Sequence, residues 1–223
     1  MRPSHRLARR LQAFTQPTVV HHSYILSVGL TDWRAPDFTA SLEVDFRTAT
    51  TDDAEALSWG YFNGDPIAER MLAESLASRH KCYVATADGE IVGYSWTWFE
   101  GFSCHYLGAE LDWPEGTCYG GDMRVAREYR RKHVGLGLLA HGLQDARDRG
   151  YDRKVCWVLA HNEKMLGAIG QLGYRVTGEI RRTGWFPLHG SRLGPNSSGF
   201  FERFSTLSWE SDGRSGRGEP IVL

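Results

Sequence analysis

Residues 124–139 combine a run of basic side chains with two glycines and the start of an apolar helical pattern. The basic residues are Arg124, Arg127, Arg130, Arg131 and Lys132. A helix N-terminus presents unpaired N–H groups and the positive end of the helix dipole, which favour an anion. Gly135 and Gly137 carry no Cβ, so the backbone there can approach an anion closely. The pattern therefore predicts a phosphate-binding site that uses the amides of residues 131–136 together with the neighbouring charges.

Strands and helices alternate on both sides of this basic segment. The pattern predicts a strand over 117–125, a helix from Val134 to a cap at Gly150, a buried strand over 154–160 and a helix over 163–172 with Asn162 as its cap. The basic segment should therefore lie at a strand-to-helix turn, where backbone amides can converge on a phosphate.

The remaining segments predict a mixed fold. We expect strands over 18–30 and 42–50, helices from about residue 53 and over 66–79, a hairpin over 82–99 with an Asp88-Gly89 turn, a loop over 100–116, and two last strands over 174–184 and 199–209. No internal repeat is visible.

The composition is that of a soluble globular protein, with 41% hydrophobic residues, 24% charged residues and a net charge of −1. This balance argues against a nucleic-acid partner, and no apolar run is long enough to predict a membrane span. The four cysteines lack C-x-x-C spacing, so we expect reduced thiols in a cytoplasmic protein and no metal site. Residues 1–31 contain no acid and are rich in arginine, which fits either an organelle transit sequence or a solvated basic helix.

Four segments resemble the GNAT superfamily of acyl-CoA-dependent N-acyltransferases over roughly residues 42–184. FRTATTDDAEAL resembles the family's first strand and helix entry, and ATADGEIVGYSW resembles its second and third strands. VAREYRRKHVGLGLL is similar to its acyl-CoA signature, in which Val125, Tyr129, Arg130 and Gly135 fall in register. NEKMLGAIGQLGY is similar to the family's Asn-x-x-Ala helix and its Gly-Phe end, matched by Asn162, Gly173 and Tyr174.

The chain departs from the family pattern at three positions. His133 stands where the first signature glycine is expected, and Arg127 stands where proline is common. Ile169 occupies the position of a tyrosine that in many members protonates the departing thiolate. Because isoleucine cannot donate a proton, the general acid is not identified by the resemblance.

The resemblance implies a mixed, mostly antiparallel sheet of about six or seven strands with a splayed parallel pair, and helices on both faces. We expect an N-terminal basic arm and extra strand over 1–40, an acyltransferase domain over 41–210 and a flexible tail over 211–223. The implied function is acetyl transfer from acetyl-CoA to an amine in a ternary complex, by a monomer or homodimer. The implied acetyl-CoA-binding residues are Met123, Arg124, Val125, Arg130, Arg131, Lys132, His133, Val134, Gly135, Leu136, Gly137 and Asn162.

A base is also required, because the attacking amine must be neutral. Asp122 is the first candidate, since it lies on the strand beside the expected thioester carbonyl, and Glu110 and Glu115 are weaker candidates. An aspartate with only a structural role is the alternative at this position. His133 can contribute to phosphate binding or be purely structural, and Asn162 can cap a helix, bind pantetheine or do both.

The acceptor side carries its own signal. From Cys82 to Met123 the chain has seven acids and no Lys or Arg, and the basic run begins at the next residue. This partition favours a cationic acceptor, such as a small amine or a peptide amine, on the side away from the polyanionic donor. Trp96 and Trp98, with Glu110, are candidates for binding it, although the two tryptophans can equally form a core face.

Two other functions remain open at this point. One is a non-catalytic acyl-CoA-binding or regulatory module on the same fold, which the isoleucine at 169 favours. The other is an N-acyltransferase that uses a longer acyl donor, which would need an apolar tunnel beside Gly120 and Gly121.

Overall fold

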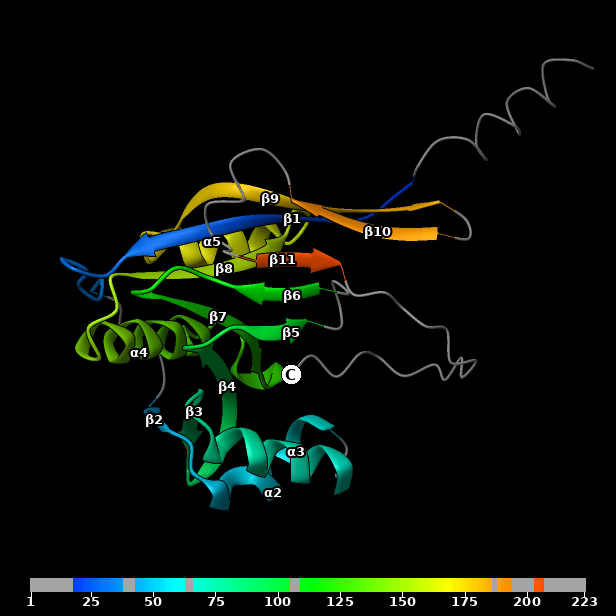
Figure 1. Ribbon diagram of the computed structural model, residues 1–223. Coiled ribbons are helices and arrows are strands. Elements are labelled where there is room, and N and C mark those ends of the chain that lie inside the picture. The colour runs from blue at the N-terminus through cyan, green and yellow to red at the C-terminus, as the bar shows by residue number, and fades with distance from the viewer. Residues whose placement is uncertain are drawn as a thin grey trace, which may run out of the picture.

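The computed structural model describes residues 18–37, 43–62, 66–104, 109–185, 188–193 and 203–206 of the 223-residue chain (Figure 1). The strands are β1 Thr18–Gly29, β2 Asp45–Thr48, β3 Lys81–Ala87, β4 Glu90–Trp98, β5 Phe102–Cys104, β6 Ala109–Asp112, β7 Thr117–Val125, β8 Arg153–Leu159, β9 Arg175–Trp185, β10 Leu188–Leu193 and β11 Arg203–Thr206. The helices are α2 Ala54–Phe62, α3 Pro66–Ala77, α4 Val134–Asp148 and α5 Glu163–Gln171, with short 3-10 turns η1 Thr51–Asp53 and η2 Arg127–Tyr129. Each of these helices is too short or too polar to cross a bilayer.

Eight strands form the main sheet in the order β10-β9-β1-β8-β7-β4-β3-β2. All neighbours are antiparallel except β7 and β8, which run parallel and pair only where residues 117–119 meet residues 153–155. Beyond Tyr119 the two strands separate, while β7 stays paired with β4 on its other edge. The mixed sheet with a splayed parallel pair is therefore confirmed, with eight strands instead of six or seven.

Helices cover both faces of this sheet, as expected. The side chains of Leu57 from α2 and Leu72 from α3 pack in one apolar cluster with Val84 and Trp96. On the opposite face, buried side chains of α4 and α5 share a second cluster with β1 and β8. Successive side chains of each strand therefore point to opposite faces of the sheet, as expected for β-strands.

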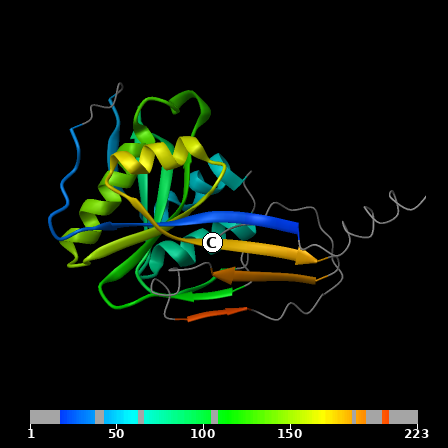
Figure 2. The same cartoon turned by 90° about the horizontal axis from the view of Figure 1, so that it is seen from above.

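Strand β1 lies inside the main sheet, between β8 and β9, although it comes first in the chain. It pairs with β8 from Ser23 to Gly29 and with β9 over most of its length, and Figure 2 shows these long strands side by side. The segment predicted as a loop over 100–116 instead contains β5 and β6, which join β11 in a separate three-stranded sheet. Strand β10, which pairs with β9, was also not predicted.

Candidate functional site

The turn before α4 holds two non-glycine residues in the left-handed region. Arg131 has φ 63° and His133 has φ 62°, with Lys132 between them. Left-handed L-residues cost about 1–2 kcal/mol each, and such strain is concentrated at functional sites. Alternation of this kind turns successive backbone N–H groups toward a common point and makes an anion-binding concavity. Glycine adopts this left-handed conformation without strain, which explains why the family pattern has a glycine at the position of His133.

The first turn of α4 adds amides to this concavity. The N–H groups of Val134, Gly135 and Leu136 have no acceptor within the helix, because they belong to its first three residues. The N–H of Gly137, in contrast, donates to the carbonyl of His133 at 2.9 Å. The side chains of Val134 and Leu136 are buried, at 1% and 8% exposure, so only their backbone can face a ligand.

Gly137 has a packing role that the sequence analysis missed. An ideal Cβ on Gly137 would collide with the ring of Phe46 on β2. An ideal Cβ on Gly135 would instead meet Met123 and Val125 at ordinary distances of 3.4 Å or more. Gly137 therefore lets α4 approach β2, and of the two glycines only Gly135 faces the candidate ligand space.

Two adjoining cavities follow the splayed strands. The larger, of about 720 Å³, lies between the open ends of β7 and β8 and is covered by α5. The smaller, of about 320 Å³, lies between the end of β7 and the start of α4 and is lined by Met123, Arg124, Val125, Arg130, Arg131 and Gly135. The two cavities share Met123 and Arg130, so they adjoin along β7.

Most of the predicted basic residues lie at the smaller cavity. The guanidinium of Arg130 donates from Nε to the carbonyl of Val125 at 2.9 Å, which ties the basic turn to the end of β7. Lys132 lies over the ring of Tyr129, at 5.6 Å from its centroid, and lines neither cavity. Positive charge is thus concentrated where β7 ends and α4 begins, as the sequence predicts.

Asp122 lies in the wall of the larger cavity and interrupts the pairing of β7 with β4. Ser95 is opposite Met123 and Trp96 is opposite Gly121, so Asp122 is the extra residue of a β-bulge, with φ 38°. Its side chain is only 12% exposed and accepts a hydrogen bond at Oδ2 from the hydroxyl of Tyr94 at 3.1 Å. Burial raises the pKa of Asp122 above its usual range, although Arg124 and the Tyr94 hydrogen bond oppose that shift.

Asn162 lies where the open end of β8 leads into α5. Its Oδ1 accepts from the N–H of Met165 at 3.2 Å, so the predicted helix cap is confirmed. The same side chain lines the larger cavity, and among the described residues none accepts a hydrogen bond from its Nδ2. The cap and a ligand contact are therefore compatible.

The family model for the GNAT acetyltransferases matches residues 30–174, which include all of these site residues. The chain belongs to the GNAT acetyltransferase family. A search of curated proteins finds no significant match.

Solved structures agree with this GNAT fold. A GCN5-related N-acetyltransferase from Sphaerobacter thermophilus is 20% identical with a TM-score of 0.54, and the match covers 88% of this chain and 59% of that protein. A glucosamine N-acetyltransferase region of a fungal multi-domain GH3 β-N-acetylglucosaminidase is 16% identical with a TM-score of 0.56, and the match covers 79% of this chain and 22% of that one. At this identity the likeness concerns the fold alone.

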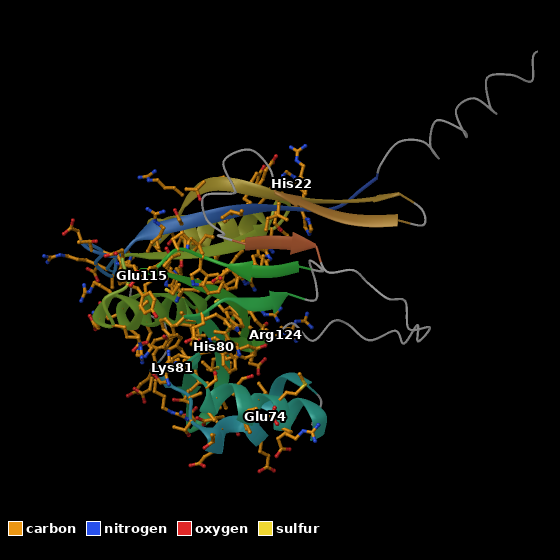
Figure 3. The ribbon with its side chains drawn as sticks, in the orientation of Figure 1. His22, Glu74, His80, Lys81, Glu115 and Arg124 are labelled. Carbon is orange, nitrogen blue, oxygen red and sulfur yellow. The ribbon has the colours of Figure 1, made fainter. Side chains whose placement is uncertain are left out.

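The residues expected on the acceptor side lie in different parts of this GNAT chain. Trp96 and Trp98 are buried at 3% and 6% exposure, belong to the apolar core and line neither cavity. Glu110 is on β6, but its side chain lies outside the described residues. Glu115 precedes β7 and is therefore separated from Asp122 by most of that strand, and Figure 3 shows it well apart from Arg124.

Two aromatic side chains that the sequence analysis did not select line the larger cavity. Tyr119 and Trp157 have ring centroids 4.7 Å apart, at the point where β7 and β8 separate. Trp157 falls within an apolar run whose pattern predicts only a buried strand. No local pattern marks it as cavity-lining, because the separation of the strands depends on long-range pairing.

Ile169, which stands at the sequence position of the family's tyrosine, also lines the larger cavity and is 1% exposed, and its side chain has no group that can donate a proton. The thiol and hydroxyl groups nearby belong to Cys156, Tyr119 and Tyr174. Burial raises the pKa of Cys156 to about 12 and that of Tyr174 well above its usual value. Across the described residues no group of three or more His, Cys, Asp or Glu could hold a metal ion.

Proposed function

We propose that this GNAT protein transfers an acetyl group from acetyl-CoA to an amine by direct attack within a ternary complex. The observation that carries this proposal is the pair of adjoining cavities along β7. One ends at a positively charged turn with converging amides, and the other contains a buried carboxylate. A polyanionic donor requires positive charge and hydrogen-bond donors, whereas a nucleophile that must lose a proton requires a base. The smaller cavity provides the first and the larger cavity provides the second.

The smaller cavity suits the diphosphate of CoA. Arg130 and Arg131 supply charge there, and the amides of Val134, Gly135 and Leu136 supply hydrogen-bond donors at the positive end of α4. His133 would contribute backbone at its left-handed position. CoA itself would supply the activated thioester.

The edge of β7 suits the extended pantetheine arm. Residues 120–125 have no strand partner on the side of β8 among the described residues, because the pairing of these strands ends at Tyr119. Their backbone can therefore bind amide groups as an added strand does. Asn162 faces the same space from α5, and a backbone N–H near Met123 is suited to stabilise the carbonyl oxygen as its charge grows.

Asp122 would act as the base. The amine nitrogen forms the new C–N bond as the C–S bond breaks, and the carboxylate accepts the proton that the nitrogen loses. The thiolate leaves and takes a proton from solvent, since Ile169 has none to donate. A carboxylate with a raised pKa is better matched to this role than an ordinary surface aspartate.

The glycine pair at 120 and 121 does not decide the length of the acyl group. An ideal Cβ on Gly120 would lie 2.8 Å from Cε of Lys154, and one on Gly121 would lie 2.7 Å from the hydroxyl of Tyr119. Both glycines nevertheless line the larger cavity of about 720 Å³, so open space remains beside them. An N-acyltransferase that uses a longer acyl donor therefore stays an alternative to acetyl transfer.

A cationic acceptor is favoured by the surroundings of Asp122. The carboxylate shares its cavity with the faces or edges of Tyr119 and Trp157, and aromatic rings attract cations. A primary amine on a small molecule or a peptide would approach this wall as an ammonium ion and lose one proton to solvent before it attacks, so that Asp122 accepts the second proton as the C–N bond forms.

The experiment is a thiol-release assay with acetyl-CoA and a panel of cationic and neutral amines, on the wild type and on Asp122→Asn. Asparagine has nearly the same shape and tolerates a positive φ, so the fold should be retained. We expect turnover with cationic amines and a loss of about 10²- to 10⁴-fold in Asp122→Asn, with CoA affinity unchanged by calorimetry. Asp148→Asn, on the exposed end of α4, is the control and should keep full activity.

A non-catalytic acyl-CoA-binding module is the second candidate, and the isoleucine at 169 is the observation that favours it. CoA binding without thiol release for any amine would support the module. Full activity in Asp122→Asn would remove the carboxylate from the mechanism while leaving the transferase function in place.

A further inference from the structure

The strand β4 brings a buried hydroxyl to Asp122. Tyr94 is 1% exposed, and its O–H donates to Oδ2 of Asp122 at 3.1 Å. The residue directly opposite Tyr94 on β7 is Arg124, whose Nε lies 3.8 Å from Oδ1 of the same carboxylate. The two oxygens of Asp122 therefore have different environments.

This difference leaves one oxygen suited to proton transfer. Oδ2 is held by Tyr94, whereas Oδ1 accepts no hydrogen bond from the described residues, because Arg124 is beyond hydrogen-bond distance. Arg124 is also 45% exposed, so solvent weakens its attraction for the carboxylate. Oδ1 therefore has its full accepting capacity for an amine, whereas Oδ2 already accepts one hydrogen bond.

The bulge makes a fixed partner necessary. A carboxylate on a left-handed residue that interrupts a ladder has no regular neighbour on its own strand to hold it. Without the Tyr94 hydroxyl, the carboxylate would accept no side-chain hydrogen bond from the described residues. The ring of Tyr94 is packed in the apolar core, so its hydroxyl has a fixed position.

Resting on the proposed function, in which Asp122 is the base, we infer that Tyr94 is a positioning residue that holds Oδ2 and presents Oδ1 of Asp122 to the acceptor amine. This task acts through the carboxylate and needs no contact between Tyr94 and the substrate.

Other charged or titratable groups line the same cavity or interact electrostatically with this carboxylate, and the test must separate them from Tyr94. They are Arg124 and Tyr119 on β7, Arg130 before α4, Cys82 on β3, Cys156 on β8, Lys164 on α5 and Tyr174 before β9. None of them changes when only the hydroxyl of Tyr94 is removed. Tyr94→Phe keeps the ring and its packing, so it is the cleanest perturbation.

The structure offers a matched control on the other face of the sheet. Tyr83 on β3 is fully buried and its hydroxyl donates to Oδ2 of Asp145 at 2.7 Å. Tyr83→Phe therefore removes the same kind of hydrogen bond, to a carboxylate on α4 that lines neither cavity. Any effect of Tyr94→Phe that is specific to Asp122 must be absent in Tyr83→Phe.

The experiment measures kcat/KM for amine acetylation against pH in the wild type, Tyr94→Phe, Tyr83→Phe and Asp122→Asn. The hydrogen bond favours the ionised carboxylate, so its loss raises the pKa of Asp122 and moves the acid limb of the profile to higher pH, by about one unit. In Tyr94→Phe we expect activity about tenfold lower on the acid side of the limb, and KM for acetyl-CoA unchanged. Tyr83→Phe should keep the limb of the wild type.

A second measurement does not depend on turnover. The Asp122 carboxyl carbon can be titrated by ¹³C NMR in the wild type and in Tyr94→Phe, and we expect the higher pKa in the variant. If neither this titration nor the acid limb moves in folded Tyr94→Phe, the positioning role is overturned, whatever the activity of the enzyme. Loss of activity in Asp122→Asn with an unmoved limb in Tyr94→Phe would overturn Tyr94 alone, whereas full activity in Asp122→Asn would overturn the base as well.

Discussion

Lys154 is the most deeply buried cation among the described residues, and its burial predicts how the free energy of unfolding changes with pH. It lies on β8 with 1% exposure, and its Nζ donates to Oγ1 of Thr97 at 2.7 Å. The ring of Tyr83 lies 5.8 Å from Nζ, and no described carboxylate forms an ion pair with it. Gly120 and Gly142 make room for the side chain, since an ideal Cβ would lie 2.8 Å and 3.0 Å from it.

Burial lowers the pKa of Lys154 from its ordinary value of 10.5. Between the lowered pKa of the folded state and 10.5, the unfolded state binds more protons than the folded state. The free energy of unfolding therefore rises with pH across this window, by up to about 1.4 kcal/mol per pH unit for one proton. For a chain of this size that slope corresponds to roughly 3–6 °C in Tm per pH unit.

Lys154→Met keeps the length of the side chain and removes the proton. At pH 7 we expect the variant to be as stable as the wild type or more stable, by about 1–4 kcal/mol, because a buried cation with a single hydrogen-bond partner is costly. The advantage should shrink as pH rises toward 10.5. Other groups that titrate in this range are present in both proteins and cancel in the difference.

The assay is urea unfolding of both proteins at closely spaced pH values from 7 to 10.5. Lys164→Met, which removes an exposed lysine from α5, is the control and should run parallel to the wild type. If the Lys154→Met and wild-type curves also run parallel over the whole range, Lys154 has an ordinary pKa in the folded protein and the reasoning from its burial is refuted.

Two further substitutions test the turn before α4. Gly135→Asp places a carboxylate at the smaller cavity and should lower CoA affinity by about ten- to a thousandfold in calorimetry. Gly167→Asp, on the open side of α5 where a Cβ meets nothing within 4 Å, should leave that affinity unchanged, and equal losses in both variants would contradict a phosphate site at the turn. His133→Gly relieves the left-handed conformation and should raise the free energy of unfolding by about 0.5–1 kcal/mol. CoA affinity should be unchanged in His133→Gly, and a clear loss would show that the imidazole itself contacts the ligand.

Local signals in the sequence predict much of this fold. Strand β7 has the predicted bounds of 117–125, Asn162 caps α5, and Gly150 ends α4 with a φ of 86°. The Asp88-Gly89 turn closes the hairpin of β3 and β4, and both residues have positive φ. Each of these features depends on residues that are close in the chain.

Features that depend on distant pairing were not predicted. Strand β1 was recognised as a strand, but its place between β8 and β9 follows from contacts with residues more than 120 positions away. The packing role of Gly137 was not predicted for the same reason, because it depends on the ring of Phe46 on a distant strand. For the site, the sequence identifies Asp122 as a candidate but not Tyr94 as its partner, since the bulge that joins them depends on strand register.

Two irregularities of β7 lie within a few residues of each other and have one structural consequence. After Tyr119 the strand loses β8 on one edge, and at Asp122 it bulges against β4 on the other. A bulge bends its strand and increases the local twist, so β7 is bent within a few residues of the point where its pairing with β8 ends. The residue that places a carboxylate in the wall of the cavity thus lies in the part of β7 that is unpaired on the side of β8. Gly120 and Gly121 lie between the two irregularities, and an ideal Cβ there would press against the side chains of Lys154 and Tyr119, so both side chains occupy space that the glycines leave.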